Sequence, residues 1–342
     1  MIPRRTDRRT PRRSPRRRAA VAVVGTAAAV VLTACSGSSG GDASSTLPTV
    51  SPATSATMPA TASSSSSGSP TAAAGRLYVS VGDSYAAGYQ PSGRTGGATT
   101  RNGFAYQVVR LAKARGYDLT LANFGCSGAT TASALSRAGC GDRQLGPGAT
   151  PYRKPQVAAA VDYLRAHRGQ VALLTVSLGG NDVTACAAAA DVNAATSCVS
   201  AALQRITANI TTIVTRLRAA AGPATRIVGL TYPDVFLGGT ISNDPRQRQL
   251  ASVSVLAFRS LINPQLQAAY ARGGASFADV TAATGAYGSQ ERTTTLQPYG
   301  EIPVPVARIC TLTYYCQYQD IHPRTEGYRL IAELVTRTLP QR

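Results

Sequence analysis

Segments with the pattern of buried strands alternate with longer helical segments from residue 76 to residue 339. The most continuous apolar strand is QVALLTVSLGG at residues 170–180, as expected for a central strand covered on both faces. Such alternation favours an α/β fold, in which helices cover both faces of a parallel sheet. Strands are predicted at 76–82, 118–125, 170–180, 226–232 and 275–280, and helices at 102–116, 154–169, 200–221, 246–272 and 324–339.

The N-terminal segment has the pattern of an export signal. Residues 1–18 carry nine arginines and one aspartate, and the apolar run that follows them is too short for a comfortable membrane span. Residues 1–34 are therefore predicted to be a signal peptide. The sequence Leu32-Thr33-Ala34-Cys35 resembles a bacterial lipobox, in which the cysteine is diacylated and becomes the mature N-terminus. We expect a lipoprotein anchored through Cys35; a plain signal peptide with an incidental cysteine is the alternative.

Residues 35–74 consist almost wholly of Ser, Thr, Ala, Pro and Gly. Such a segment cannot bury enough apolar surface to offset the entropy of ordering it, so a flexible linker is expected.

The remaining residues, 75–342, are predicted to form one domain. This domain carries 26 lysines and arginines against 14 aspartates and glutamates, a net charge of +12. The arginines are scattered without an aromatic platform, so we expect no nucleic-acid partner, and attraction to an anionic surface is the more natural use of the charge.

Six cysteines follow Cys35, and an even number in an exported chain implies disulfides. Fifteen connectivities are possible, and the short sequence separations favour three local pairs. No pair has metal-ligand spacing, so we expect no metal and no cofactor. The protein is expected to be a monomer outside the cytoplasm, lipid-anchored to the outer face of the cell membrane or secreted. The favoured pairs are Cys126–Cys140, Cys186–Cys198 and Cys310–Cys316.

Polar and small residues follow three of the predicted strands. Ser84 ends the motif Gly-Asp-Ser after the first strand, Gly125 follows the second, and Asn181 follows two glycines after the third. Ligands bind at the carboxyl ends of the strands in parallel sheets, so these residues are expected to share one site. A serine there suggests a nucleophile. The Gly125 N–H and the Asn181 amide could stabilise an oxyanion, although each motif also suits a turn.

A serine nucleophile requires a general base, most often histidine, and the chain has only two histidines. His167 lies in the last turn of a predicted helix, where a cation suits the helix dipole and a surface role is favoured. His322 lies outside regular structure just before the last helix, where no structural role calls for histidine. His322 is therefore the predicted base.

Together, Gly82-Asp83-Ser84, NFGCSGATT (123–131), SLGGNDV (177–183) and DIHPRTEGY (320–328) resemble the SGNH hydrolases, also called GDSL-type esterases and lipases. The resemblance spans nearly all of residues 76–338. It implies a flavodoxin-like three-layer α/β/α sandwich and assigns roles within the site. These roles are nucleophile and first oxyanion donor for Ser84, further oxyanion donors for Gly125 and Asn181, and general base for His322.

The sequence departs from the family pattern beside the histidine. The family usually places an acid three residues before it, where this chain has Gln319, whereas Asp320 lies two residues before. Either Asp320 reaches the imidazole through a shifted backbone, or a backbone carbonyl near Gln319 orients the ring. Asp83 is expected to brace the turn without reacting.

The resemblance implies a serine esterase or lipase that hydrolyses acyl esters, small-molecule or lipid, through an acyl-serine intermediate. Two alternatives stay open. One is a carbohydrate O-acetyl esterase acting on polysaccharide, and the other is a catalytically silent surface lipoprotein. Residues 282–323 are predicted to form a long irregular arm whose tyrosines could line an acyl groove or a sugar platform.

Overall fold

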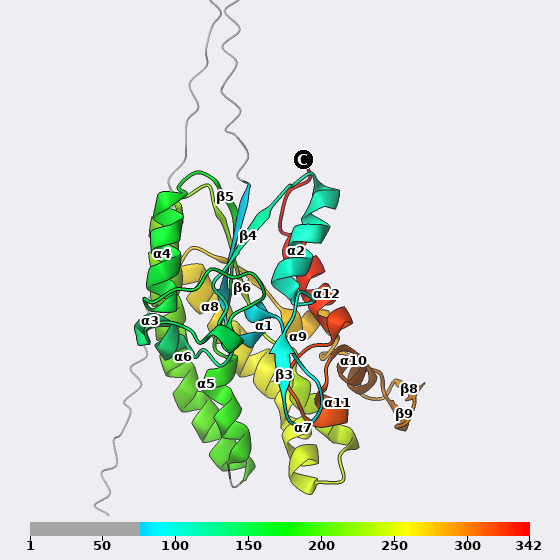
Figure 1. The fold of residues 1–342 in the computed structure, drawn as a ribbon. Coiled ribbons are helices and arrows are strands. Elements are labelled where there is room, and N and C mark those ends of the chain that lie inside the picture. Colours follow the sequence, from blue (N-terminus) through cyan, green and yellow to red (C-terminus); the bar gives the residue numbers. More distant parts are fainter. Residues whose placement is uncertain (1–75, 190) are drawn as a thin grey trace, which may run out of the picture. The chain divides into compact units, whose positions relative to one another are not determined.

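Five parallel strands form the central sheet of the protein, seen in a computed structural model that describes residues 76–189 and 191–342 (Figure 1). The order across the sheet is β4-β1-β5-β6-β7. The first strand therefore lies between the second and the third, which is the order of flavodoxin-like folds, and the predicted α/β class is confirmed. The strands are β1 (Leu77–Gly82), β4 (Thr120–Asn123), β5 (Val171–Ser177), β6 (Arg226–Leu230) and β7 (Ser276–Ala278).

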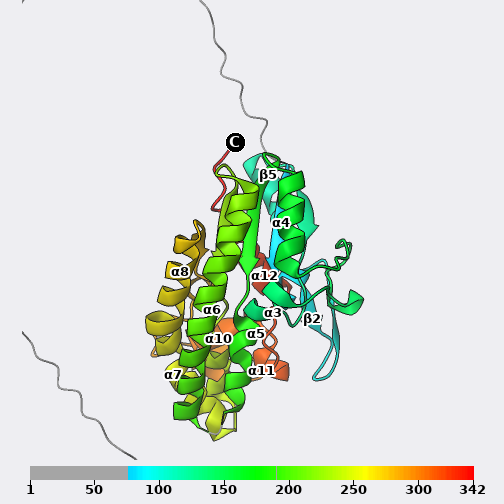
Figure 2. The same ribbon diagram turned by 90° about the vertical axis from the view of Figure 1, so that its left-hand side faces the viewer.

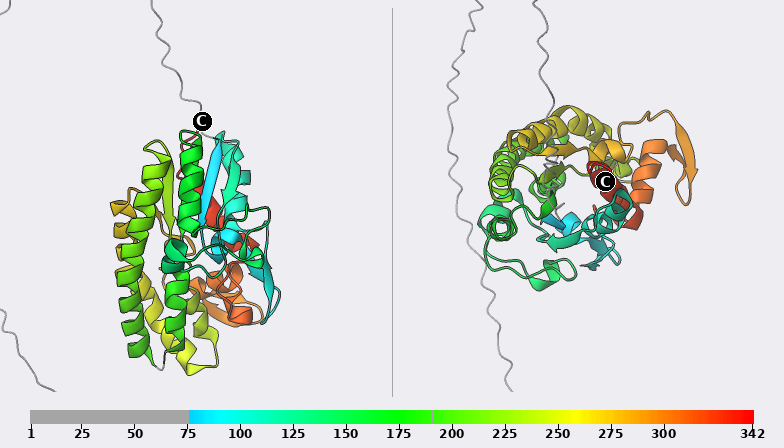
Figure 3. Two further views of the ribbon diagram at one scale, coloured as in Figure 1. Left: turned by 60° about the vertical axis from the view of Figure 1, so that its left-hand side comes forward. Right: turned by 90° about the horizontal axis from the view of Figure 1, so that it is seen from above.

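Helices cover both faces of this sheet (Figures 2 and 3). One layer holds α4 (Gln156–Ala166), α6 (Val192–Ala221) and α8 (Asn263–Arg272), and the other holds α2 (Phe104–Ala112) and α12 (Thr325–Thr336). Val79 of β1 packs into the first layer, whereas its neighbour Tyr78 packs into the second. Because successive strand residues point to opposite faces, a strand buried on both sides has to be apolar throughout.

The remaining elements around the sheet are short. They are α1 (Ser84–Ala87), the hairpin strands β2 (Tyr89–Pro91) and β3 (Gly97–Thr99), α3 (Thr131–Ser136), α5 (Gly180–Thr184) and α9 (Val280–Ala283), with 3₁₀ turns at Lys113–Arg115, Asp142–Gln144, Ala185–Ala188 and Val235–Ile241.

The helix α6 begins at Val192, earlier than the predicted start at residue 200. The Asp191 side chain caps it by accepting a hydrogen bond of 2.8 Å from the Ala194 N–H. A disulfide from Cys198 in its second turn to Cys186 ties this early part to the chain before it. The cap and the disulfide fix the early part of the helix.

The helix predicted at 246–272 is two helices, α7 (Pro245–Ala257) and α8, joined by a π-helical turn at Phe258–Ile262. Pro264 is at the start of α8. Proline lacks an N–H, and its ring crowds the preceding turn. The wider π turn accommodates the missing hydrogen bond and the ring, and the backbone stays helical from α7 into α8.

The prediction of an irregular arm at residues 282–323 is wrong. This segment contains its own apolar cluster, in which Ile302, Val306 and Ile309 pack against Leu237. Val306 and Ile309 are three residues apart, so they lie on one face of a short helix and are buried together. The segment holds α9's last residues, the hairpin strands β8 (Thr293–Leu296) and β9 (Gly300–Pro303), and the helices α10 (Val304–Leu312) and α11 (Tyr315–Tyr318).

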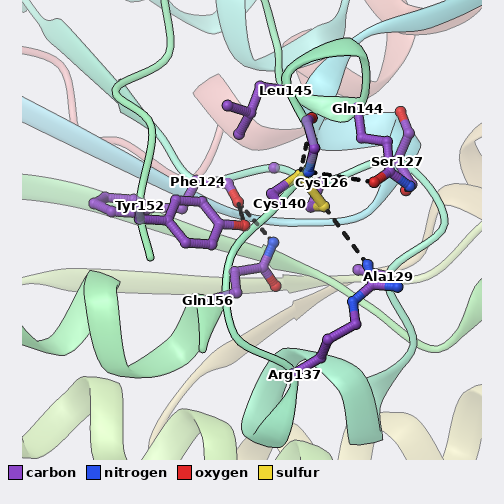
Figure 4. Close-up of a disulfide and its surroundings, with 12 residues drawn as sticks. Phe124, Cys126, Ser127, Ala129, Arg137, Cys140, Gln144, Leu145, Tyr152 and Gln156 are labelled. Atoms are coloured by element: carbon purple, nitrogen blue, oxygen red, sulfur yellow. Dashed lines mark hydrogen bonds between the residues drawn. A yellow bond between two sulfur atoms is a disulfide. The ribbon is translucent and has the colours of Figure 1, made fainter. Parts of the chain in front are cut away.

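The structure contains the three disulfides that the short sequence separations favour. Figure 4 shows Cys126–Cys140, which closes the loop after β4. Gln144 reinforces this loop. Its side-chain amide donates to the Ser127 carbonyl (2.8 Å), and its backbone carbonyl accepts from the Ser127 N–H (2.9 Å). Disulfides persist in oxidising compartments, so the protein is extracytoplasmic.

The predicted signal peptide (1–34), the lipidation site Cys35 and the predicted linker (35–74) lie outside the described residues. Within the described part of the chain, no helix has both the length and the apolar character required to span a membrane.

Candidate active site

Ser84 is the first residue of α1, directly after β1, at the carboxyl edge of the sheet. The turn from strand to helix is tight. A Cβ atom on Gly82 would lie 2.7 Å from the Ser177 carbonyl oxygen and 2.8 Å from the Ala86 Cβ, so only glycine fits there. The Asp83 side chain caps α1 by accepting from the Tyr85 N–H at 3.0 Å. The local sequence thus holds the serine at a fixed position.

His322 lies between Ser84 and Asp320. Its Nε2 is 2.8 Å from the Ser84 Oγ, and its Nδ1 is 2.7 Å from the Asp320 Oδ1. A carboxylate can only accept, so Nδ1 carries the hydrogen and Nε2 is free to accept from the serine hydroxyl. The His322 and Asp320 side chains are 13% and 25% exposed, which shields this chain of hydrogen bonds from bulk water while leaving it reachable.

Asp320 is the group that contacts the ring, and it also accepts from the His322 backbone N–H at 2.9 Å. Burial disfavours the charged carboxylate, but the hydrogen bonds and the charge of His322 outweigh it and lower the pKa of Asp320 below its ordinary value. The preceding residue, Gln319, adopts the left-handed conformation with φ of 57°. This reversal brings an acid only two residues upstream within reach of the imidazole.

The loop that carries His322 is fixed from several sides. The Tyr85 hydroxyl donates to the Ile321 carbonyl at 2.6 Å, and the Tyr314 N–H donates to the His322 carbonyl at 3.0 Å. The Tyr89 ring packs against the imidazole with 4.6 Å between ring centroids. Aromatic packing and backbone hydrogen bonds therefore limit the rotation of the imidazole.

Asn181 belongs to α5, which follows β5 after a Gly179 with φ of 118°. Its side-chain Nδ2 donates to the Ala129 carbonyl at 2.9 Å and lies 3.5 Å from the Asp83 Oδ2. The amide of Asn181 is thus beside the turn that presents Ser84, as the strand-end rule predicts.

The N–H of Gly125, a predicted oxyanion donor, already has an acceptor in this structure. Its N–H already donates to the Asn123 Oδ1 at 2.9 Å. A Cβ atom at this position would lie 2.6 Å from the Ala87 nitrogen, so glycine is needed for the close approach of the loop to α1. Gly128, three residues on, is exposed, has φ of 81°, and its N–H finds no acceptor among the described residues.

Asp83 is fully buried behind the serine. Its Oδ2 accepts from the Tyr232 hydroxyl at 2.6 Å, in addition to the cap on α1 and the contact with Asn181. Burial raises the pKa of Asp83 to about 6. These contacts agree with a bracing role that connects the ends of β1, β5 and β6.

Two hydrogen-bonded residue pairs that support the site were not predicted from the sequence. Tyr232 follows β6 and bonds Asp83, and the strand-end rule applied to that strand could have indicated it. Asp182 accepts from the Thr131 N–H (2.9 Å) and hydroxyl (2.6 Å), which joins the loop after β4 to α5. Nothing in the sequence marks this second pair, because the two residues are far apart in the chain.

His167 is remote from this site. Its Nδ1 is 2.8 Å from the Tyr163 carbonyl oxygen, and its ring stacks on that tyrosine at 4.1 Å. The residue lies between the end of α4 and the start of β5, at the amino edge of the sheet. This agrees with the surface role, and not a catalytic one, that was predicted for it. In the described residues, no cluster of three His, Cys, Asp or Glu side chains could hold a metal ion.

The fold and the serine–histidine–aspartate geometry define the class of α/β serine hydrolases. The model of the GDSL-like lipase/acylhydrolase family matches residues 80–330, a range that includes Ser84, Asn181 and His322. The chain therefore belongs to the GDSL-like lipase/acylhydrolase family, and it is a carboxylic ester hydrolase.

Several solved structures are similar to this chain in fold. An extracellular lipase from Streptomyces rimosus is 17% identical, with 77% of this chain and 100% of that chain covered and a TM-score of 0.46. An aryl esterase from M. smegmatis is 12% identical (77% and 97% covered, TM-score 0.42). A carbohydrate acetylesterase from Sinorhizobium meliloti is 13% identical (77% and 100% covered, TM-score 0.39). No curated protein matches the sequence.

Proposed function

We propose that Ser84, His322 and Asp320 are the catalytic triad of this ester hydrolase. In the first step, the Ser84 Oγ forms a bond to the ester carbonyl carbon while His322 Nε2 takes the hydroxyl proton. The bond to the alcohol oxygen then breaks, and the alcohol leaves with the proton from Nε2. Water next attacks the acyl-serine, gives its proton to Nε2, and the carboxylic acid leaves as Ser84 regains a proton.

Asp320 accepts from Nδ1 throughout this cycle. It fixes the tautomer that leaves Nε2 free and stabilises the imidazolium that forms in each step. Its lowered pKa supports this role, because the carboxylate stays charged at neutral pH.

We further propose that the oxyanion is held by the Ser84 N–H, the Asn181 amide and the Gly128 N–H. Gly128 replaces Gly125 in this set because the Gly125 N–H already has an acceptor. One hydrogen of the Asn181 Nδ2 donates at 2.9 Å to the carbonyl of Ala129, the residue after Gly128, and the other has only a long contact of 3.5 Å with the Asp83 Oδ2, so this second hydrogen is the one proposed to reach the oxyanion. Removing one such donor typically lowers the rate about 100- to 1000-fold.

The substrate proposed is an acyl ester with an apolar acyl part, as in an esterase or lipase. A carbohydrate O-acetyl ester is the second candidate. It is favoured by Tyr318 next to the His322 loop, since an aromatic face can hold a sugar ring; the neighbouring Tyr314 ring stacks on Tyr318 at 5.8 Å and is covered by the Arg324 guanidinium. Rates on p-nitrophenyl esters of increasing chain length, compared with an acetylated polysaccharide, separate the two.

We also propose that a lipid on Cys35 anchors the protein at the outer face of the cell membrane through the linker of residues 35–74. The signal-like sequence and the charge of +12 on residues 75–342 support this. The test is fatty-acid labelling in a bacterial host. Label on the full protein that is lost in Cys35→Ala supports the anchor, and equal membrane retention of both forms contradicts it.

The observation that carries the proposal is the pair of contacts from one imidazole, 2.8 Å to the Ser84 Oγ and 2.7 Å to the Asp320 Oδ1. Its test is hydrolysis of p-nitrophenyl acetate by the purified protein and by Ser84→Ala and His322→Ala. Both variants should lose kcat by a factor of roughly a thousand or more, with unchanged thermal unfolding. Wild-type rates in either variant would rule out the triad.

A further inference from the structure

Two adjoining apolar cavities lie between the residues next to the active site and the space between α6 and α7. The inner cavity is lined by Tyr85, Gly180 and Ile321, the immediate neighbours of Ser84, Asn181 and His322. The outer cavity lies between α6 and α7. Four residues line both cavities: Val183, Phe236, Phe258 and Ile262. We call the two together the α6–α7 groove.

One face of α6 forms the long wall of this groove. Val192, Ala195, Val199, Leu203 and Ile206 line it and are spaced by three or four residues, so they lie on one side of the helix. Fourteen helical residues separate the first and last of them, which corresponds to about 21 Å at 1.5 Å per residue. The wall is therefore much longer than an acetyl group.

The groove offers a substrate almost no polar partner. No charged side chain lines either cavity in the described residues. Ser254 is one of the few polar residues in the outer cavity, and its hydroxyl already donates to the buried Asp234 at 2.8 Å. A sugar or a charged group would lose its hydrogen bonds to water there without replacement, whereas a hydrocarbon chain would lose nothing.

We propose that the α6–α7 groove binds the acyl chain of the ester, so that the preferred substrates are esters of medium- to long-chain fatty acids. This inference rests on the proposed function. Gly180 and Tyr85 at the inner end adjoin the proposed oxyanion donor Asn181 and the nucleophile Ser84, between which the ester carbonyl would lie. The alcohol oxygen has to face His322 Nε2, which protonates it as it leaves, so we assign the groove to the acyl chain, the other substituent of the carbonyl carbon.

The first measurement is kcat/KM of the full protein on soluble p-nitrophenyl esters from acetate to octanoate, below the concentration at which they aggregate. Each buried methylene should raise kcat/KM up to about fourfold, so octanoate should exceed acetate by on the order of a hundredfold. Lengthening the alcohol of an acetate ester over the same range should have a much smaller effect.

Ala195→Phe fills the outer part of the groove from the α6 wall. It should lower the octanoate-to-acetate ratio of kcat/KM at least tenfold. Val199→Asn, which adds an amide to the same wall without added bulk, should lower the ratio in the same direction and covers the case in which Ala195→Phe does not fold. The matched control is Ala201→Phe on the exposed side of α6, which should leave the ratio unchanged.

The outcomes separate this inference from the proposed function. A protein that hydrolyses acetate through Ser84 but shows no gain with acyl length, or whose gain survives in both groove variants, overturns the acyl assignment and leaves the triad intact. In that case the groove binds something other than the substrate, such as a second copy of the chain. A protein without any Ser84-dependent hydrolysis contradicts the proposed function itself.

Discussion

Asp320 reaches the His322 ring because the backbone reverses at Gln319. A left-handed conformation at a non-glycine residue leaves no mark in the sequence, so the residues alone left the carboxylate and a backbone carbonyl equally possible. The structure distinguishes them by a 2.7 Å contact from Nδ1 to the Asp320 Oδ1. We therefore propose that the charge of Asp320 supports the imidazolium.

Asp320→Asn tests this directly. The amide keeps the size of the side chain but removes the charge and can favour the wrong histidine tautomer, so kcat should fall on the order of a thousandfold or more with little change in KM. Gln319→Asn is the control, because asparagine also tolerates the left-handed backbone, and it should stay near wild-type activity. A loss below tenfold in Asp320→Asn would assign the orienting role to another group. Steady-state kinetics on p-nitrophenyl butyrate measures both.

Asn181→Ala removes the one side-chain donor proposed for the oxyanion. Because the interaction is strongest in the transition state, kcat should fall about 100- to 1000-fold while KM changes little. Asn193→Ala, an exposed asparagine in α6, serves as the matched control. A change in KM alone would mean that Asn181 binds the ground state instead.

The residues of the proposed oxyanion site could be predicted from the sequence only in part. The strand-end rule correctly predicted that Ser84, Asn181 and the loop after β4 lie together. It did not separate Gly125 from Gly128, since both are glycines of one loop. We propose a structural role for the first glycine because its N–H donates to the Asn123 side chain and because its Cα lies close to α1.

At the scale of elements, the contact between the β4 loop and α1 carries a prediction of its own. Gly125→Ala places a methyl group against the backbone at Ala86 and Ala87, and overpacking of this kind typically costs about 1–3 kcal/mol of folding free energy. The same change at Gly93, where an added Cβ meets nothing within 4 Å, should alter stability by less than about 0.5 kcal/mol. Urea unfolding monitored by circular dichroism measures both, and equal stability of the two variants would contradict the packing described here.

The elements themselves were predicted with uneven success. The five strands and the main helices follow from apolar patterns that the sheet buries on both faces. The prediction for residues 282–323 was wrong because the elements there are short. They bury a separate small cluster around Val306 and Ile309, and elements this short show no long periodic pattern in the sequence. The early start of α6 coincides with a cap by Asp191 and a disulfide from Cys198, neither of which the apolar pattern indicates.

At the scale of the whole molecule, a buried acid away from the triad makes folding stability depend on pH. Asp234 has no exposed surface, and burial raises its pKa from 3.8 to about 6. The folded state therefore binds this proton more tightly than the unfolded state. The stabilising contribution is complete below about pH 4 and is lost as the pH rises through about 6.

Asp234→Asn removes this titration. Between pH 4 and pH 7, the unfolding free energy of wild type should fall relative to that of the variant by up to roughly 3 kcal/mol. Urea unfolding of both proteins at several pH values measures the difference, which cancels the other titrating groups. A difference that stays constant with pH, or that moves in favour of wild type, would contradict the assignment.

The central claim is that Ser84 is a nucleophile activated by His322, and covalent labelling tests it most directly. The protein is treated with a fluorophosphonate, which phosphonylates activated serines, and the modified residue is mapped by peptide mass spectrometry. We expect one adduct per chain, on Ser84, and none in His322→Ala over the same time. An unlabelled protein, or an adduct on a different serine, would contradict it.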